Sequence, residues 1–501
     1  MKRKLSLLLA FLMLSSTLSA CGSESEGEVT TSGTSGSEKT TTAAADWGLP
    51  EKDFGGKTLK ILTMNPTDTA TGKIKEGTTI GQLYAEEESG DVMNDATYKR
   101  NQLVAQRYNI QLEVNYGSTD NNAEIEQWVK ALLADEYIAD LFDCGLWFME
   151  KMSSQGLLLD LRQLPYMNFD QPWWDKNLME DYSVMGEYLF AFGDIATGHY
   201  DSAKVLYFNK DMVEDYKMES PYTYVSDGSW TIDRFAEYVK QVSGDLDGDG
   251  RMWYNDLFGY AGGATSTYLF MVGAGSKTMG RTADGSFEST FITERSLSAL
   301  AKASNVLYDE SLALIANIGK YSDDDAEDAA MAYKAFDEGR ALFYQGTLGD
   351  IVTMRGTEVE FGVIPFPKLD EVQDRYYNPI DAGAKAIAVA YNAPDHELIG
   401  FGLEALCAAS TELLRPAYID TTLKTKGVRD DESVAILDMI MDSLTIDIGQ
   451  VYNFGDINGY IIYNFEREKI DNLVSRYESI KDSIMASYET VAELYRGIYE
   501  N

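Results

Sequence analysis

Short apolar runs with the two-residue period of β-strands alternate with amphipathic segments along most of this chain, and few folds accommodate that order. Residues 58–63 are predicted to form the first strand, because apolar side chains alternate there after a Gly-Gly pair. Further strands are predicted at residues 110–114, 140–143, 205–208, 341–344, 361–363 and 385–389. Helices are predicted at residues 94–108, 123–134, 148–155, 231–242, 294–307, 326–338 and from 396 onward. This order indicates an α/β fold with mostly parallel strand pairing.

Two of these helices begin at residues typical of helix N-caps. Asn94 is predicted to cap the helix at 94–108, and Thr231 the helix at 231–242. In the second helix Ile232, Phe235 and Val239 fall on one apolar face. Because open α/β sheets bind ligands beyond the carboxyl ends of their strands, we expect the functional side chains in the loops that follow the strands.

Length and charge restrict the organisation and the partners. The chain has 501 residues, and about 455 remain after its N-terminal signal and linker, which is too many for one compact core. Its 42 basic and 81 acidic residues give a formal charge of −39. Phosphate backbones and anionic lipid repel such a body, so we expect no nucleic-acid partner and no membrane contact beyond an anchor.

The N-terminal residues have the layout of a secretory signal. Basic residues at positions 2–4 precede an apolar stretch at 7–14, and Leu18-Ser-Ala-Cys21 resembles the lipobox of bacterial lipoproteins. We therefore expect residues 1–20 to be a signal peptide and Cys21 to carry lipid at the outer face of the cell membrane. Residues 21–50 are predicted to form a flexible tether, because residues 22–45 are mostly Gly, Ser, Thr and Glu.

Motifs for catalysis are scarce. The two histidines, His199 and His396, are too few for a His-x-x-x-His zinc site or a local Ser-His-Asp arrangement. Residues 273–278 resemble a P-loop, but their spacing is wrong, and a turn is predicted instead. Cys144 and Cys407 allow at most one bridge and are expected to be free, buried thiols. Paired carboxylates for glycoside hydrolysis keep an extracellular glycosidase as the alternative from another class.

Three pairs of segments resemble the extracellular solute-binding proteins of ABC importers, family 1, of the maltose-binding-protein type. The pairs are 140–147 with 155–160, 186–193 with 205–211, and 336–346 with 361–367. The resemblance implies a type II periplasmic-binding fold of two α/β lobes joined by hinge crossings, which closes on a solute. It also implies a monomeric, non-enzymatic receptor that delivers its solute to permease subunits. Residues 68–91 have no counterpart in the family pattern.

The resemblance also implies the division of the chain into lobes. The expected parts are a first lobe at 51–195, a second lobe at 196–382, a return to the first lobe at 383–412, and a helical C-terminal part of the second lobe at 413–501.

Carbohydrate is the expected solute, because sugars are recognised by flat aromatic rings and by polar groups that bond their hydroxyls, and such residues lie in the loops facing the expected cleft. The predicted ligand-binding residues are Trp147, Tyr200, Asp201, Thr265, Thr267, Tyr268, Gln345, Thr347, Tyr452, Asn453 and Phe454. Thr265, Thr267 and Tyr268 are placed in a polar loop. Trp173 and Trp174 are expected to pack the back of the first lobe. A surface glycan-binding lipoprotein without a transporter is a further alternative.

One loop has the ligand spacing of EF-hand and dockerin-like calcium sites. In residues 245–256, carboxylates stand at positions 1, 3, 5 and 12, and glycine stands at position 6. The predicted ligands of a structural Ca²⁺ ion are Asp245, Asp247, Asp249, Arg251 through its carbonyl oxygen, and Asp256. Aspartate at position 12 reaches less far than glutamate, which should weaken binding. An empty Asp/Gly-rich turn is the alternative.

Overall fold

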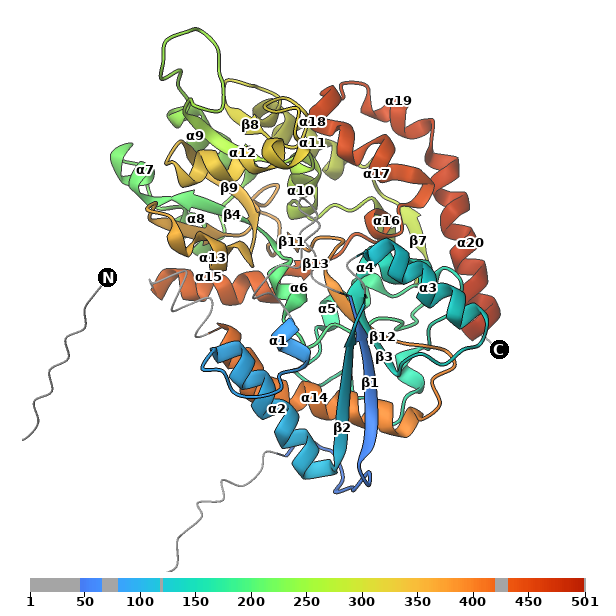
Figure 1. Cartoon of the computed structure of the whole chain (residues 1–501). Helices are drawn as coiled ribbons and strands as arrows, with labels where there is room; N and C mark the ends of the chain where they lie inside the picture. The colour runs from blue at the N-terminus through green and yellow to red at the C-terminus, as the bar shows by residue number, and fades with distance from the viewer. Residues whose placement is uncertain (1–45, 65–79, 118–119, 420–430, 500–501) are drawn as a thin grey trace, which may run out of the picture. The chain divides into compact units, whose positions relative to one another are not determined.

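Three early strands and one late strand form the first β-sheet (Figure 1). In the computed structural model, which describes residues 46–64, 80–117, 120–419 and 431–499, these strands are β1 (Lys57–Thr63), β2 (Ile110–Tyr116), β3 (Leu141–Gly145) and β12 (Lys385–Val389). Their order is β12-β3-β1-β2. Strand β1 is parallel to β2 and β3, whereas β12 is antiparallel to β3. The carboxyl ends of β1, β2 and β3 therefore share one edge of the sheet.

Six helices accompany this sheet. They are α1 (Ile80–Leu83), α2 (Val92–Tyr108), α3 (Asn121–Leu133), α4 (Leu146–Ser153), α5 (Lys176–Tyr182) and α14 (His396–Pro416). The prediction that Asn94 caps α2 is wrong: Asp91 Oδ1 accepts hydrogen bonds from the amides of Met93 and Asn94, both at 3.0 Å. The helix ends at Asn109, which adopts a left-handed conformation with φ of 53°. It packs against α14 (Figure 1).

The second sheet has five strands in the order β10-β4-β9-β5-β8. They are β4 (Lys204–Asn209), β5 (Phe258–Gly262), β8 (Ala313–Ile315), β9 (Ala341–Thr347) and β10 (Phe361–Ile364). Strand β5 is parallel to β8 and β9, but β4 is antiparallel to both β9 and β10. The expectation of mostly parallel pairing therefore holds for only part of this sheet.

Helices flank the second sheet, and a small hairpin packs on the C-terminal helix α20 (Lys481–Tyr499) (Figure 1). The helices are α7 (Lys210–Asp215), α8 (Pro221–Ser226), α9 (Ile232–Val242), α10 (Ser266–Gly273), α11 (Glu294–Leu307), α12 (Asp325–Asp337) and α13 (Asp350–Thr353). The hairpin consists of β6 (Met279–Arg281) and β7 (Phe287–Ser289). Thr231 caps α9 as predicted, because its hydroxyl oxygen accepts a hydrogen bond from the amide of Arg234 at 3.3 Å.

Within the described residues, two chain crossings connect the sheets and are bonded to each other. The first passes through α6 (Gly198–Asp201), and the second follows β11 (Asn378–Pro379). Ala203 and Ile380 form an antiparallel bridge, and the amide of Asp381 donates to the carbonyl oxygen of Ser202 at 3.0 Å. Strand β11 also pairs with β13 (Leu444–Thr445) from the C-terminal part of the chain.

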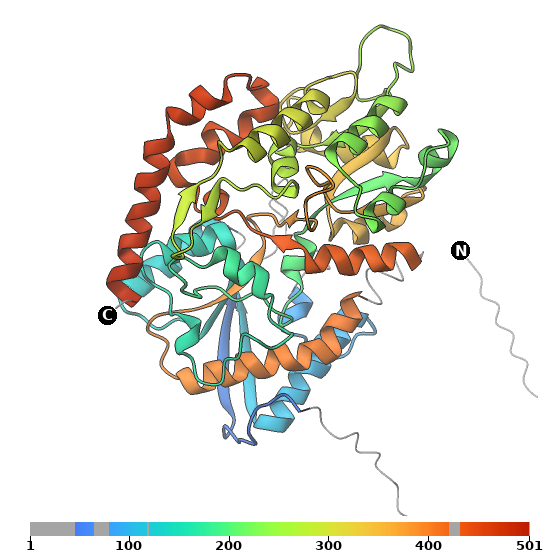
Figure 2. The same ribbon diagram turned by 180° about the vertical axis from the view of Figure 1, so that it is seen from behind.

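The C-terminal helices contact elements of both sheets. They are α15 (Asp431–Asp442), α16 (Ile448–Val451), α17 (Ile457–Tyr460), α18 (Phe465–Glu468), α19 (Leu473–Glu478) and α20 (Lys481–Tyr499). Helix α15 packs on β10 and α8, whereas α20, the longest red helix in Figure 2, packs on the hairpin strand β7. Tyr452 OH lies 2.8 Å from Tyr495 OH of α20 and 3.0 Å from Ser153 Oγ of α4. Residues 413–501 therefore do not belong to the second lobe alone.

A fully buried arginine ties α2 to its neighbours. Arg100 has 0% exposure. Its Nη1 donates to the Ile195 carbonyl oxygen at 2.7 Å and to Ser410 Oγ of α14 at 3.1 Å. Its Nη2 donates to the carbonyl oxygens of Gln82 and Leu83, at 2.8 and 2.9 Å. Burial lowers the pKa of the guanidinium to about 10, and no carboxylate pairs with it in the described part of the chain. Its Nε donates to Asn101 Oδ1 at 2.8 Å, so uncharged backbone, hydroxyl and amide oxygens compensate this buried charge.

Two adjacent tryptophans share one buried carboxylate. The indole N–H groups of Trp173 and Trp174 donate to Oε1 and Oε2 of Glu404, both at 3.1 Å. Burial raises the pKa of Glu404 to about 7. Both rings are buried, which confirms that they pack the first lobe.

The two cysteines of the described residues carry no disulfide. Cys144 and Cys407 are both free and buried, as predicted. None of the described helices is long and apolar enough to cross a membrane. The predicted signal peptide and Cys21 lie outside the described residues.

Candidate functional site

A buried ion pair organises the carboxyl edge of the first sheet. Asp143 of β3 accepts a hydrogen bond from the Thr63 hydroxyl of β1 at 2.6 Å. Lys385 of β12 places its Nζ 2.9 Å from the same Asp143 oxygen and also donates to Thr63 Oγ1 and to the Met64 carbonyl oxygen, each at 2.9 Å. The Asp143 side chain is only 4% exposed. The network therefore fixes the ends of three strands relative to one another.

Three exposed aromatic side chains lie at this edge. Tyr84 follows α1, Tyr116 ends β2, and Trp147 is the second residue of α4; their exposed fractions are 39%, 37% and 44%. Tyr116 lies opposite Thr63 in the register of β1 and β2. Burial raises the pKa of Tyr116 to about 12, and the charges of Asp143 and Tyr84 add to the shift. Large aromatic faces left open to solvent beside placed polar groups suit a ligand with apolar and hydroxylated surfaces.

The two crossings connect these first-sheet residues with the second sheet. The Trp147 amide donates to the Ala382 carbonyl oxygen at 3.3 Å. Asp381, the residue before Ala382, forms an ion pair with Lys204 at 2.8 Å. The Lys204 ammonium holds the pKa of Asp381 below its usual range. Lys204 lies opposite Thr347 in the register of β4 and β9.

The end of β9 presents polar groups on the second-sheet side. Gln345 Oε1 accepts hydrogen bonds from Tyr260 OH and Ser266 Oγ, both at 2.7 Å. Its amide N–H₂ donates to no atom of the described residues. The Thr347 amide donates to Asp350 Oδ2 at 2.8 Å. Both residues were predicted in a loop, but β9 continues to Thr347 because β4 pairs with its last five residues, Phe343–Thr347.

Contacts thus join some of the predicted ligand residues. Trp147, the crossing at 381–383, Lys204, Thr347 and Gln345 form a continuous series of neighbours. Thr265 is half-buried next to Ser266. Asp201 is also near the crossing, where its carboxylate accepts a hydrogen bond from Tyr418 OH at 2.7 Å.

Other predicted residues are used in packing. The prediction of a polar loop at 265–268 is wrong, because Thr267 and Tyr268 lie in the buried helix α10. The Thr267 amide donates to Glu466 Oε1 at 2.5 Å, and Tyr268 OH donates to Asp447 Oδ2 at 3.2 Å.

Two further predicted regions are mostly enclosed. Tyr200 of α6 is buried and stacks on Tyr418 with 6.2 Å between ring centroids. Tyr452 and Phe454 are buried and stack on each other, at 5.2 Å. Asn453 between them is exposed, and its Nδ2 donates to Asp456 Oδ1 at 3.1 Å.

The sequence interpretation did not include several residues of this site: Tyr84, Tyr116, Asp143, Lys204, Asp381 and Lys385. Tyr116 was missed because the predicted strand stopped at residue 114, although an aromatic residue at a strand's carboxyl end was a usable signal. The sequence around Asp381 and Lys385 gave less indication of a role in the site, because the residues they pair with lie far away in the sequence.

The acidic loop at 245–256 lies between α9 and β5, separate from these residues. Single oxygens of Asp245, Asp247 and Asp249 all lie within 4.8 Å of one another, and the three side chains are exposed. Oxygen-only groups of this kind fit a hard cation. Asp256 does not join them: it is buried, and its oxygens accept the amides of Leu246 at 2.9 Å and Trp253 at 2.7 Å.

Comparison with known proteins identifies the family. A model of the bacterial extracellular solute-binding protein family matches residues 90–405. The chain belongs to this family. Its members bind small solutes and deliver them to ABC permeases. No curated protein matches the sequence of this solute-binding protein.

Solved structures of two receptors share the fold of the solute-binding protein. An ABC substrate-binding protein of Listeria monocytogenes, in complex with cycloalternan, has a TM-score of 0.50 at 13% identity and covers 87% of this chain and 99% of its own. The GacH receptor of Streptomyces glaucescens GLA.O, studied unliganded and with acarbose and an acarbose homolog, has a TM-score of 0.51 at 11% identity and covers 89% and 99%. The predicted two-lobed α/β fold is thereby confirmed.

Proposed function

We propose that this protein captures a mono- or oligosaccharide between its lobes and presents it to an ABC permease without chemical turnover. The observation that carries the proposal is the set of exposed aromatic rings, Tyr84, Tyr116 and Trp147, beside the polar network of Asp143 and Lys385. The ligands named for the two similar receptors, cycloalternan and acarbose, are carbohydrates and support the same class. A solute that contacts both lobes favours the closed form, because it binds that form more tightly.

Trp147→Ala is expected to weaken sugar binding by roughly 10-fold or more, because a half-open aromatic face at the centre of a binding surface contributes strongly. Isothermal titration with sugars that raise the melting temperature of the parent protein measures the effect. Trp253→Ala is the matched control, since Trp253 is similarly exposed, at 40%, and lies in the acidic loop. Equal affinity of the Trp147→Ala protein and the parent would remove Trp147 from the site, and release of sugar products during the titration would favour a glycosidase.

We propose that the acidic loop binds Ca²⁺ through Asp245, Asp247, Asp249 and the Arg251 carbonyl oxygen. The ion would hold together three exposed carboxylates that otherwise repel each other. We expect EDTA to lower the melting temperature and Ca²⁺ to restore it. A double variant, Asp247→Asn with Asp249→Asn, should melt at the same temperature with and without Ca²⁺. A parent protein whose melting is insensitive to both reagents argues against the ion.

We propose that lipid on Cys21 and the tether that follows hold the receptor at the outer face of the cell membrane. Tethering raises its effective concentration near the permease. In cells, the parent protein should be found in the membrane fraction and require detergent for extraction, whereas Cys21→Ser should be released in soluble form. Equal release of both proteins would contradict the anchor.

A further inference from the structure

A second cavity, outside the candidate sugar site, lies between α5 and the loop that follows α10. Its volume is about 430 Å³, within the size range of small-molecule sites. The residues that matter for its chemistry are Lys277, Arg295, Arg375, Asp181 and Tyr377. The loop is the segment at 273–278 that resembles a P-loop in sequence but has the wrong spacing for one.

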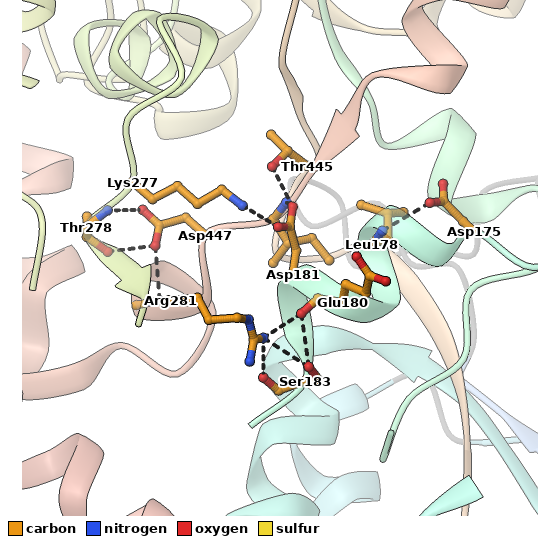
Figure 3. Close-up of polar contacts among 12 residues, drawn as sticks. Asp175, Leu178, Glu180, Asp181, Ser183, Lys277, Thr278, Arg281, Thr445 and Asp447 are labelled. Carbon is orange, nitrogen blue, oxygen red and sulfur yellow. Dashed lines mark hydrogen bonds and ion pairs between the residues drawn. The ribbon is translucent and has the colours of Figure 1, made fainter. Parts of the chain in front are cut away.

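The lining is cationic in a strongly acidic protein. Three basic side chains face one carboxylate, although the whole chain carries 81 acidic against 42 basic residues. Lys277 Nζ is paired with Asp181 at 2.7 Å (Figure 3). Neither Arg295 nor Arg375 forms an ion pair with any described residue. The cavity therefore holds positive charge that no carboxylate of the described residues pairs with, apart from Asp181 at Lys277.

The two arginines are held differently. Arg295 is anchored, because its Nε donates to the Ala274 carbonyl oxygen at 2.7 Å and its Nη2 donates to Gln373 Oε1 at 2.6 Å. Arg375 rests on the Tyr377 ring, with its guanidinium carbon 4.6 Å from the centroid. Its five N–H donors have no polar partner among the described residues, so the ring positions the guanidinium without consuming its hydrogen-bonding capacity.

The loop that carries Lys277 is fixed by its own contacts. Thr290 Oγ1 donates to the Lys277 carbonyl oxygen at 2.8 Å. The amide and hydroxyl of Thr278 donate to the buried Asp447, at 2.6 and 2.7 Å (Figure 3). Gly275 has φ of 76°, and a Cβ there would come within 3.0 Å of the Tyr377 ring. These contacts fix the backbone of the loop that carries Lys277, so the position of its ammonium group in the cavity is restricted.

We propose that this cavity binds a small oxyanion of the phosphate or sulfate class. The planar guanidinium of Arg375 can donate two parallel hydrogen bonds to such an anion, while Arg295 and Lys277 add positive charge. The anion competes with Asp181 of α5 for Lys277. This binding site is distinct from the proposed sugar site and does not require that proposal.

Isothermal titration of the full chain with sodium phosphate and with sodium sulfate tests the site, with ionic strength held constant by chloride. We expect saturable binding of at least one anion. Arg375→Gln should weaken it roughly 10-fold, the effect of losing charge-assisted hydrogen bonds. Lys277→Gln should weaken it as well, because Asp181 then opposes the anion without a counter-charge.

Arg234→Gln is the matched control. Arg234 is an arginine outside the cavity, with its guanidinium carbon also 4.6 Å from a tyrosine ring centroid, that of Tyr224. The control should bind the anion as the parent does. Absence of saturable heat with both anions at tens of millimolar overturns the proposal. Equal affinity of Arg375→Gln and the parent overturns it too, because the anion then binds elsewhere.

Discussion

Arg100→Ala is expected to lower the free energy of unfolding by about 4 kcal/mol or more, because it leaves several buried acceptors unpaired and opens a cavity. The acceptors belong to α1, α14 and the start of the first crossing, so the loss affects three elements at once. Urea denaturation followed by circular dichroism measures the change. Arg100→Lys should recover part of the loss, since an ammonium retains the charge but cannot reach all the oxygens that the guanidinium bonds.

Lys99→Ala is the control for this prediction. Lys99 is the preceding residue of α2, its side chain is 56% exposed, and it pairs with Glu88 at 2.8 Å. Exposed pairs of this kind contribute less than about 1 kcal/mol. If Arg100→Ala unfolds at the same urea concentration as Lys99→Ala, the buried guanidinium does not organise the first lobe.

Lys385→Met is expected to cost about 3–5 kcal/mol, because it leaves the Asp143 carboxylate buried with only the Thr63 hydroxyl as a side-chain partner. The Lys385 side chain is 17% exposed and that of Asp143 4%, so water compensates little. Adding Asp143→Asn to this variant should restore part of the stability, because the uncompensated charge is then removed. Thermal and urea unfolding of both variants provide the comparison.

Lys57→Met supplies the control from the other end of the first sheet. Lys57 pairs with Asp395 at 2.6 Å, but its side chain is 54% exposed, and we expect a loss below about 1 kcal/mol. A double variant that is no more stable than Lys385→Met alone would show that the loss comes from packing and not from the charge of Asp143.

The sequence predicted elements well where periodicity or a cap was unambiguous. The predicted strand at 385–389 and helix at 294–307 coincide with β12 and α11, and Thr231 caps α9. The errors have physical causes. Asp91 caps α2 in place of Asn94 because its carboxylate reaches two amides. Helix α10 was taken for a polar loop, since Ser266 and Thr267 are polar, yet the Ser266 hydroxyl bonds Gln345 inside the fold.

Prediction of the site residues was limited by contacts between segments that are distant in the sequence. The rule that ligands lie beyond the carboxyl ends of strands predicts Trp147, which follows a buried strand and is exposed there. The same rule could not indicate that Tyr452 and Phe454 pack against each other, or that Asp381 pairs with Lys204. Such partners are set by the three-dimensional contacts of distant segments, which a single sequence does not reveal.

The position of β12 beside β3 also determines the order in which the protein can fold. Asp143 and Lys385 are separated by 242 positions in the chain. During synthesis β3 therefore remains an open sheet edge until the whole second sheet has emerged, and closing such a distant pairing is slow. An unpaired strand at the edge of a sheet can pair incorrectly with strands of other chains. The receptor's earliest strands consequently depend on some of its latest residues, so chains that terminate before β12 leave the first lobe unfinished and prone to aggregation.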